Sequence, residues 1–275
     1  MPPHTAPTAV DLGARLLGRP LEHDRVLTGG QHARTVMADD AGRRVVVRTF
    51  PRGDDAVRRE VAVLTLLGPL GELAPSVLAH GQVDGVPTIV TTALPGAPPA
   101  DGLDPMVIAE QMGAALARIH RIAPVGLPDE SRAPTRHAGR LAARAREAWE
   151  RTDRTRVLTH GDFWCGNAVW DGAVLTGIVD WSGAMSAPRG VDIAWCRQDL
   201  VLLGAPDAAD RFLRSYEVHA GRLVDDVHAW DLIAASRADP YVETWEPNYL
   251  GIGQSGVTAP VIRSRFDAWV RHLLG

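Results

Sequence analysis

The stretch Leu94–Pro99, which reads LPGAPP, separates two parts of the chain that follow different patterns. Prolines and a glycine this close together end helices and interrupt sheets, so they mark a boundary. Before the boundary, short β-branched segments alternate with turn residues. After it, apolar residues recur at the spacing of helices. We therefore predict an α+β protein with two lobes, residues 1–94 and residues 95–275.

The first part is predicted to be a small, strand-rich lobe with one main helix. Strands are predicted where β-branched residues run between turn signals, at Arg44–Arg48 and Thr88–Thr92. The main helix is predicted to begin at Asp54-Asp55, the candidate N-caps, and to end before Gly68. A further short helix is predicted at Asp11–Leu21.

The second part is predicted to be the larger lobe and mostly helical. Its apolar residues recur at intervals of three and four, which places them on one face of a helix. The residues that follow this spacing are Ile108, Met112, Leu116 and Ile119, then Phe212, Leu213 and Tyr216, and finally Ile262, Phe266, Trp269, Val270 and Leu273. The alanine- and arginine-rich stretch Arg140–Arg151 is predicted to form another helix.

Charge balance and apolar pattern argue against two classes of partner. The formal net charge is −4, without the basic excess of a nucleic-acid-binding protein. No uninterrupted apolar run approaches the ~20 residues that span a bilayer. Cys165 and Cys196 stand alone, which fits a reducing compartment, and the N-terminus carries no secretory signal pattern. We expect a cytoplasmic protein with a small-molecule substrate and neither a nucleic-acid nor a membrane partner.

Between two helical regions lies a segment of another kind, Val157–Asp180. Two short apolar runs flank the pair Asp171-Gly172, a turn that favours a tight β-hairpin. A hairpin brings its ends together, and Asn167 precedes the first strand whereas Asp180 follows the second. We therefore expect Asn167 and Asp180 to face one point.

The polar residues of this segment have the chemistry of phosphoryl transfer. Asn167 and Asp180 offer oxygen ligands that suit Mg²⁺, a cation that also binds water and phosphate oxygens. Asp162, on the loop that leads into the hairpin, could receive the proton of a substrate hydroxyl. A metal clamp on nucleotide phosphates and a carboxylate that orients the acceptor are what phosphoryl transfer needs. The pattern HxDxxxxN alone occurs by chance, but together with the hairpin it predicts a phosphoryl-transfer centre.

The segments His160–Asn167 (HGDFWCGN) and Ile178–Trp181 (IVDW) resemble the two signatures of the aminoglycoside phosphotransferase family. This family is the antibiotic-kinase branch of the protein-kinase-like fold. The resemblance implies a bilobal fold with a small antiparallel-sheet lobe, which binds the nucleotide, and a larger helical lobe for catalysis and substrate binding. It also implies ATP or GTP and Mg²⁺ as cofactors, and a small hydroxylated molecule as the acceptor.

The resemblance assigns a role to each matching residue. It implies Asp162 as the catalytic base, Asn167 and Asp180 as Mg²⁺ ligands, and His160 as structural support of the loop. Asp192, in the sequence DIA, resembles the family's aspartate that hydrogen-bonds the catalytic-loop backbone. These assignments agree with the chemistry deduced from the residues themselves.

In the first lobe the resemblance implies a nucleotide site that consists of Arg48, Glu60 and the loop residues Gly29, Gly30 and Gln31. Arg48 stands where the family usually has lysine, and the chain contains no lysine, so an arginine must serve. Each of these residues also has a structural interpretation. Arg48 could be a surface arginine of a strand, Glu60 a solvated carboxylate of a helix, and Gly29 and Gly30 an ordinary hairpin turn. The alternative function is a nucleotide-binding pseudokinase or regulatory module without transfer activity.

Trp164 and Cys165 depart from the family signature, since many members have His-Pro there. This change alters the floor of the acceptor site. Cys165 is predicted to be a packed, inert thiol rather than a reactive one.

Several acceptors are compatible with the last third of the chain. Its carboxylates could bind a polycationic aminoglycoside or simply face solvent; they are Asp225, Asp226, Asp231, Asp239, Glu243 and Glu246. Tyr241, Trp245 and Tyr249 lie among them, so a macrolide, a sugar, an amino alcohol or a natural-product intermediate is an equal candidate.

Overall fold

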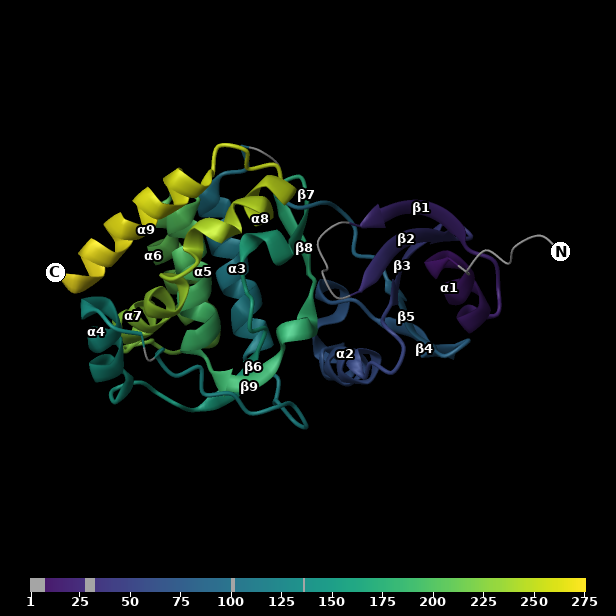
Figure 1. Cartoon of the computed structure of the whole chain (residues 1–275), viewed down its shortest axis with the longest axis horizontal. Coiled ribbons are helices and arrows are strands. Elements are labelled where there is room, and N and C mark those ends of the chain that lie inside the picture. The colour runs from purple at the N-terminus through teal and green to yellow at the C-terminus, as the bar shows by residue number, and fades with distance from the viewer. Residues whose placement is uncertain (1–7, 28–32, 100–101, 136) are drawn as a thin grey trace. The chain divides into compact units, whose positions relative to one another are not determined.

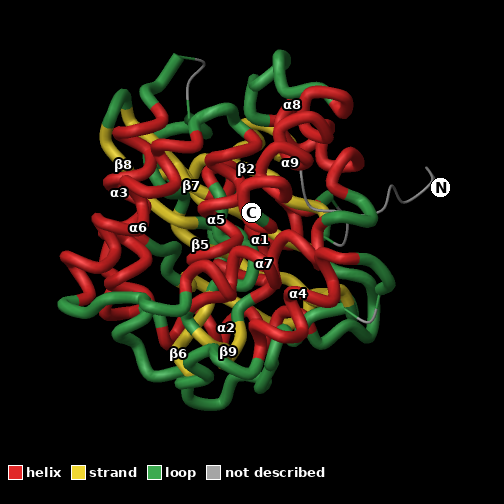
Figure 2. Tube along the Cα trace, turned by 90° about the vertical axis from the view of Figure 1, so that its left-hand side faces the viewer, coloured by secondary structure: helices red, strands yellow, loops and turns green. Residues whose placement is uncertain are grey.

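The computed structural model describes residues 8–27, 33–99, 102–135 and 137–275 of the chain (Figure 1). It divides between Leu94 and Pro95 into two compact units. The N-terminal unit contains a sheet with helices, whereas the C-terminal unit is mostly helical with short strands (Figure 1). Figure 2 draws the helices in red and the strands in yellow. This mixture confirms the predicted α+β fold class. In the part of the chain that is described, no helix is long and apolar enough to cross a membrane.

A five-stranded antiparallel sheet with the strand order β1-β2-β3-β5-β4 forms the centre of the N-terminal unit. Its elements in chain order are α1 (Ala9–Leu17), β1 (Glu22–Leu27), β2 (Arg34–Asp40), β3 (Arg43–Thr49), α2 (Ala56–Leu66), the 3₁₀ helix η1 (Gly68–Leu73), β4 (Val77–Val83) and β5 (Val86–Thr92). Both predicted strands and the predicted main helix are present.

Helix α1 packs on one face of this sheet and forms the core of the unit with it. The core residues are Ala9, Val10, Val36, Ala38, Val45, Val47 and Val90. The predicted bounds Asp11–Leu21 for this helix were wrong. The helix begins earlier because Thr8 and Asp11 form a capping box, in which the Thr8 hydroxyl accepts from the Asp11 N–H at 3.2 Å. It ends at Leu17 because Gly18 adopts a left-handed conformation there.

The C-terminal unit surrounds one buried helix with other helices and two short two-stranded sheets. Its helices are α3 (Pro105–Ile119), α4 (Arg140–Trp149), α5 (Gly190–Leu202), α6 (Pro206–Ala220), α7 (Val227–Ala238), α8 (Glu246–Gly251) and α9 (Ala259–Leu274). Its strands are β6 (Arg156–Thr159), β7 (Ala168–Asp171), β8 (Val174–Ile178) and β9 (Met185–Pro188), and its 3₁₀ helices are η2 (Cys165–Asn167), η3 (Trp181–Gly183) and η4 (Val242–Trp245).

Helix α5 is buried on nearly all sides, and it packs against α6, α7 and α9. Its buried polar residues, which include Asp192, Arg197 and Asp199, form hydrogen bonds with neighbouring elements. Strands β6 and β9 pair with each other, as do β7 and β8. The β7–β8 hairpin and the loop between β6 and β7 carry the residues predicted to do chemistry.

Candidate active site

The β7–β8 hairpin brings Asn167 and Asp180 together. Ala168 pairs with Ile178, and just beyond this pair the Val179 N–H donates to the Asn167 carbonyl at 2.9 Å. Asp180 follows directly, with a φ of 57° in the left-handed region that few non-glycine residues adopt. Its carboxylate Oδ1 accepts a hydrogen bond from the Ser182 hydroxyl at 2.8 Å. The hairpin geometry is thus the one that the Asp-Gly turn predicted.

Asn167 is held by the backbone and side chain of Asp162. Its amide nitrogen donates to the Asp162 carbonyl at 2.9 Å and to the Asp162 Oδ2 at 3.1 Å. Because the two ends of an amide point apart, the Asn167 Oδ1 is directed away from Asp162. In the described part of the chain, nothing donates a hydrogen bond to that oxygen.

The oxygen atoms that Asn167 and Asp180 offer as metal ligands suit a Mg²⁺ ion. An amide oxygen and an exposed carboxylate, from Asn167 and Asp180, are hard ligands of the kind this ion binds. Among the described residues, no group of three His, Cys, Asp or Glu side chains could hold a metal. The two oxygens would therefore share the ion with water and phosphate oxygens, as is usual for Mg²⁺.

His160 is a fully buried support of the loop. Its Nε2 lies 2.9 Å from the Val179 carbonyl, and its Nδ1 lies 3.3 Å from the Asp162 backbone nitrogen. A carbonyl only accepts and a backbone N–H only donates, so the proton must be on Nε2. The ring packs against Trp181 with ring centroids 4.6 Å apart. Both nitrogens are engaged, which leaves His160 no free position for proton transfer.

Asp192 fixes the backbone of the same loop. Its carboxylate accepts from the His160 N–H at 2.7 Å and from the Gly161 N–H at 2.9 Å. Gly161 has a φ of 81°, and a Cβ there would lie 2.2 Å from the Gly183 carbonyl oxygen. Only glycine fits this close approach, which brings the loop against the segment that follows Asp180.

Helix α5 supplies two further contacts to the loop that the sequence interpretation missed. The Trp195 indole N–H donates to the Asp162 Oδ1 at 3.0 Å, and Asp199 Oδ2 accepts from the Cys165 N–H at 3.2 Å. Asp192, Trp195 and Asp199 are spaced three and four residues apart, so they lie on one helix face. Asp192 and Asp199 are two helical turns apart on one face of this helix, and this spacing was a signal available in the sequence.

Asp199 is a buried carboxyl that joins the loop to helix α8. Its Oδ1 accepts from the Tyr249 hydroxyl at 2.9 Å. Burial raises the pKa of Asp199 to about 6, against hydrogen bonds from Cys165 and Tyr249 that lower it. Burial, followed by the charge of Asp199, raises the pKa of the Cys165 thiol well above its usual value. Cys165 is thus the packed, inert thiol that was predicted.

The N-terminal unit contains the other predicted charged pair. Arg48 on β3 donates to the Glu60 carboxylate of α2 at 2.7 Å, and the two side chains are only 17% and 10% exposed. This pairing excludes a solvent-facing arginine and a solvated carboxylate. Gly29, Gly30 and Gln31 lie outside the residues that the structure describes.

The sequence matches the model of a known protein family. The model of the phosphotransferase enzyme family APH matches residues 23–232, which is most of the chain. The chain belongs to the APH family. A search of curated protein sequences finds no match.

Solved structures share the fold of this APH-family chain at low sequence identity. The apoenzyme of the macrolide 2'-phosphotransferase MphH from Brachybacterium faecium is 20% identical, with a TM-score of 0.66 over 93% of this chain and 95% of that one. An aminoglycoside-3'-phosphotransferase of type VIII is 21% identical, with a TM-score of 0.59 over 82% and 98%. A variant of APH(4)-Ia in a ternary complex with ADP and hygromycin B is 16% identical, with a TM-score of 0.63 over 95% and 97%.

The acidic residues near the C-terminus of this APH-family chain are mostly engaged by its own groups. Asp231 pairs with the buried Arg197 at 3.1 Å. Asp239 and Glu243 both pair with Arg263. The other two engaged carboxylates accept backbone N–H groups: Asp226 from Asp153 and Glu246 from Ala259. These contacts within the chain help to hold the helical unit together.

Proposed function

We propose that this protein transfers the γ-phosphate of ATP or GTP, with Mg²⁺, to a hydroxyl group of a small molecule. The observation that carries the proposal is the convergence of Asp162, Asn167 and Asp180 at the end of one hairpin. A proton acceptor next to two hard oxygen ligands is the set that phosphoryl transfer to an alcohol requires. Membership of a phosphotransferase family supports it.

Asp162 is the proposed catalytic base. Trp195 donates to its Oδ1 and Asn167 to its Oδ2, so both oxygens are oriented from the protein side. Each carboxylate oxygen retains a second lone pair, which can accept the proton of the acceptor hydroxyl as the oxygen attacks phosphorus. His160 and Asp192 support the loop and do not exchange protons with the acceptor.

Asn167 and Asp180 are the proposed ligands of Mg²⁺, which when bound neutralises charge on the nucleotide phosphates. In residues 1–94, Arg48 is proposed to bind phosphate while Glu60 orients its guanidinium group. The loop residues Gly29, Gly30 and Gln31 are proposed to offer backbone N–H groups to the same phosphates. Residues 1–94 would thus bind the nucleotide, and residues 95–275 would bind the acceptor and carry out catalysis.

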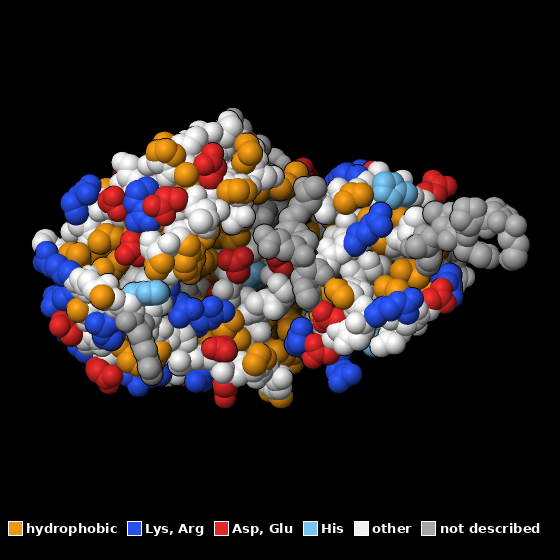
Figure 3. All heavy atoms as spheres, viewed as in Figure 1, with side chains coloured by type: hydrophobic (Ala, Val, Ile, Leu, Met, Phe, Trp, Pro, Cys, Tyr) orange, Lys and Arg blue, Asp and Glu red, His pale blue; other side chains and the backbone are white. Residues whose placement is uncertain are grey.

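A cytoplasmic location and the absence of a nucleic-acid partner are part of the proposal. Both cysteines are buried free thiols, which agrees with a reducing compartment. On the face drawn in Figure 3, blue arginine side chains are interspersed with red carboxylates. Such a surface lacks the one-signed field that attracts nucleic acid.

Asp162→Ala tests the proposal. Macrolides, aminoglycosides and hygromycin B, which the names of the structural relatives mention, form the first acceptor panel. With an accepted substrate, mass spectrometry should detect one added phosphate, and Asp162→Ala should lower kcat by about a hundredfold or more. The nucleotide should still bind, because the variant retains the proposed metal ligands. Asp171→Ala, which removes an exposed carboxylate at the hairpin turn, should have no effect.

Undiminished transfer by Asp162→Ala would contradict the assignment of the base. Nucleotide binding without release of nucleoside diphosphate, over a wide panel of hydroxylated compounds, would instead identify a pseudokinase.

A further inference from the structure

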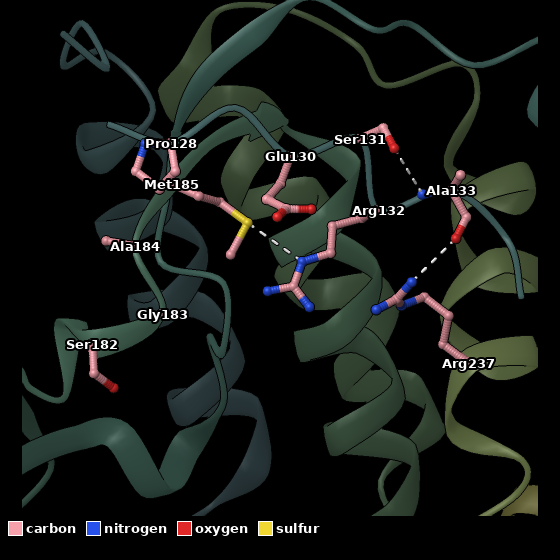
Figure 4. Close-up of a pocket in the computed structure, with 10 residues that line it drawn as sticks. All are labelled: Pro128, Glu130, Ser131, Arg132, Ala133, Ser182, Gly183, Ala184, Met185 and Arg237. Atoms are coloured by element: carbon pink, nitrogen blue, oxygen red, sulfur yellow. Dashed lines mark hydrogen bonds between the residues drawn. The ribbon is translucent and has the colours of Figure 1, made fainter. Parts of the chain in front are cut away.

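The C-terminal unit contains a cavity of about 540 Å³ beside the segment that follows Asp180. A volume of this size suits a small molecule. Its walls come from the loop around Arg132, from Ser182–Met185 and from Arg237 on α7. In Figure 4 the Arg132 guanidinium points toward Met185 and the Arg237 guanidinium toward Ala133, and both side chains line the same cavity.

Arg132, Arg237 and one carboxylate, Glu130, are the charged side chains that line the cavity. The Arg132 Nε donates to the Met185 sulfur at 3.3 Å, and the Arg237 Nη1 donates to the Ala133 carbonyl at 3.1 Å. In the described part of the chain neither forms an ion pair, although Glu130 also lines the cavity. Burial and the charge of Arg132 lower the pKa of Arg237, whereas the charge of Glu130 raises it. Two half-buried cations that share a cavity repel each other, and an anion between them would relieve that repulsion.

The backbone at Arg132 supports a functional role for this side chain. Its φ is 51°, in the left-handed region, at a cost of about 1 kcal/mol or more for a residue with a long side chain. Strain of this kind persists where the surrounding structure holds a side chain in a particular direction. Here the residue with the left-handed backbone is one of the two arginines that line the cavity.

A second, smaller cavity of about 70 Å³ is lined by both arginines and by residues next to the proposed base. Arg132 and Arg237 line it together with Gly161, Trp195 and Tyr241. Gly161 precedes the proposed base, and Trp195 donates its N–H to the carboxylate of that base. A molecule held by the two arginines can therefore lie against an aromatic wall, the side chains of Trp195 and Tyr241, and reach the catalytic loop.

The aromatic wall also favours a flat or apolar body in the ligand. Trp245 packs edge-on against Trp195 and Tyr241, with ring centroids 5.1 Å and 5.8 Å apart. Rings fixed in this way offer a rigid apolar surface with little loss of side-chain freedom on binding.

We infer that the acceptor substrate carries an anionic group, a carboxylate or a phosphate, which Arg132 and Arg237 bind while its hydroxyl faces Asp162. This inference rests on the proposed function, because it describes the acceptor of that reaction. Arginine is suited to the role, since its planar guanidinium group donates two parallel hydrogen bonds to either anion. The same pair of cations repels a polycationic acceptor, so the substrate class differs from the aminoglycosides.

Binding of matched probes tests the inference without requiring transfer. The probes are 4-hydroxyphenylacetate, its uncharged amide and 4-hydroxybenzylphosphonate, titrated calorimetrically in the presence of saturating Mg·ADP. We expect at least one of the two anions to bind about tenfold or more tightly than the amide, and the tighter anion identifies the group that the site takes. Arg132→Gln and Arg237→Gln should each remove most of this preference.

Two control variants make the result specific. Arg144→Gln removes an exposed arginine of α4 and should leave all three affinities unchanged. Arg237→Lys keeps the charge and should retain part of the preference, which covers the case in which Arg237→Gln does not fold. Equal or absent binding of anions and amide, or a preference that survives in both glutamine variants, would overturn the inference.

The outcomes separate this inference from the proposed function. Anion binding that depends on both arginines, in a protein that never releases nucleoside diphosphate, would support the anion site and contradict the phosphotransferase. Displacement of the bound anion when Mg·ATP replaces Mg·ADP would assign the arginines to the nucleotide and overturn the inference. Transfer to acceptors whose affinity does not depend on the anionic group would support the proposed function alone.

Discussion

At the scale of single residues, the catalytic loop between β6 and β7 contains two kinds of side chain. Some support the fold of the loop, and others are placed for chemistry. His160 uses both ring nitrogens for backbone groups and is buried. Asp162, in contrast, is held at each oxygen by a single donor, which leaves lone pairs toward the space where an acceptor would bind. The orientation of Asp162 therefore depends on Asn167 and on Trp195, and only the first belongs to the signature sequence.

Trp195→Phe tests the contact outside the signature. The variant keeps an aromatic ring but removes the N–H that donates to Asp162 at 3.0 Å. A hydrogen bond to a charged group contributes about 1.5–3 kcal/mol, so kcat should fall about tenfold or more. The KM for nucleotide should not change, because Trp195 is not among the proposed nucleotide ligands. Steady-state kinetics measures both constants.

Trp149→Phe is the matched control, since Trp149 packs against Trp230 and makes no contact with the catalytic loop in the described structure. An unchanged kcat in Trp195→Phe would mean that Asn167 alone orients the base.

At the scale of elements, helix α5 organises the loop from one face. Three of its side chains, Asp192, Trp195 and Asp199, form hydrogen bonds with His160, Asp162 and Cys165 of the loop, in that order. Asp199 also reaches Tyr249, so helix α8 and the loop share one buried carboxyl.

Asp199→Asn tests the energetic consequence of burying this carboxyl. Burial raises the pKa of Asp199 to about 6, above the value of about 3.9 for an unfolded aspartate. The folded state therefore binds the proton more tightly, so the stabilisation is present below about pH 4 and is lost as the pH rises through 6. Between about pH 4.5 and about pH 7.5 the wild type should lose about 2 kcal/mol of unfolding free energy relative to Asp199→Asn.

Urea unfolding at the two pH values measures this difference. Asp207→Asn, which removes an exposed carboxylate at the start of α6, should show little pH-dependent difference from wild type. A relative change of the opposite sign would show that Asp199 is stabilised as the carboxylate.

Gly113→Ala tests the packing of α3 on α6. A Cβ at position 113 would lie 2.5 Å from the Phe212 carbonyl oxygen, which belongs to the backbone and cannot turn aside. Separating the helices should cost about 1–3 kcal/mol of unfolding free energy. Gly251→Ala is the control, because a Cβ there meets nothing within 4 Å, and it should be neutral or slightly stabilising. Denaturant unfolding followed by circular dichroism compares the two, and equal effects would contradict the packing argument.

The elements and the site differ in how far local sequence predicts them. The β7–β8 hairpin and the main helices were predictable because turn residues and helical spacing act over short distances. The bounds of α1 were missed although Thr8, Asp11 and Gly18 signal them locally. The hydrogen-bond partners of Tyr249 and Arg237 could not be found in this way. Their contacts depend on how distant helices pack, which no single segment encodes.

At the scale of the whole molecule, the proposed nucleotide ligands are divided between two compact units. Arg48 belongs to residues 1–94, whereas Asn167 and Asp180 belong to residues 95–275. Each unit has its own core, so each can fold around its own contacts. A ligand that binds groups of both units would stabilise both at once, which a thermal-unfolding experiment detects.

Mg·ATP should raise the unfolding temperature of the wild type. At about one hundred times its Kd, a ligand adds about 2.7 kcal/mol of stability, which is roughly 5–10 °C for a chain of this length. Arg48→Gln and Asp180→Asn should each weaken binding about tenfold and remove about 1.4 kcal/mol of that gain, or about half of the shift. Arg144→Gln and Asp171→Asn, which change exposed residues of α4 and β7, should keep the full shift. Because Arg48→Gln also breaks the pair with Glu60, the comparison uses the shift produced by nucleotide and not the unfolding temperature itself. If either variant kept the full shift, the unit that contains the changed residue would not bind the nucleotide through it.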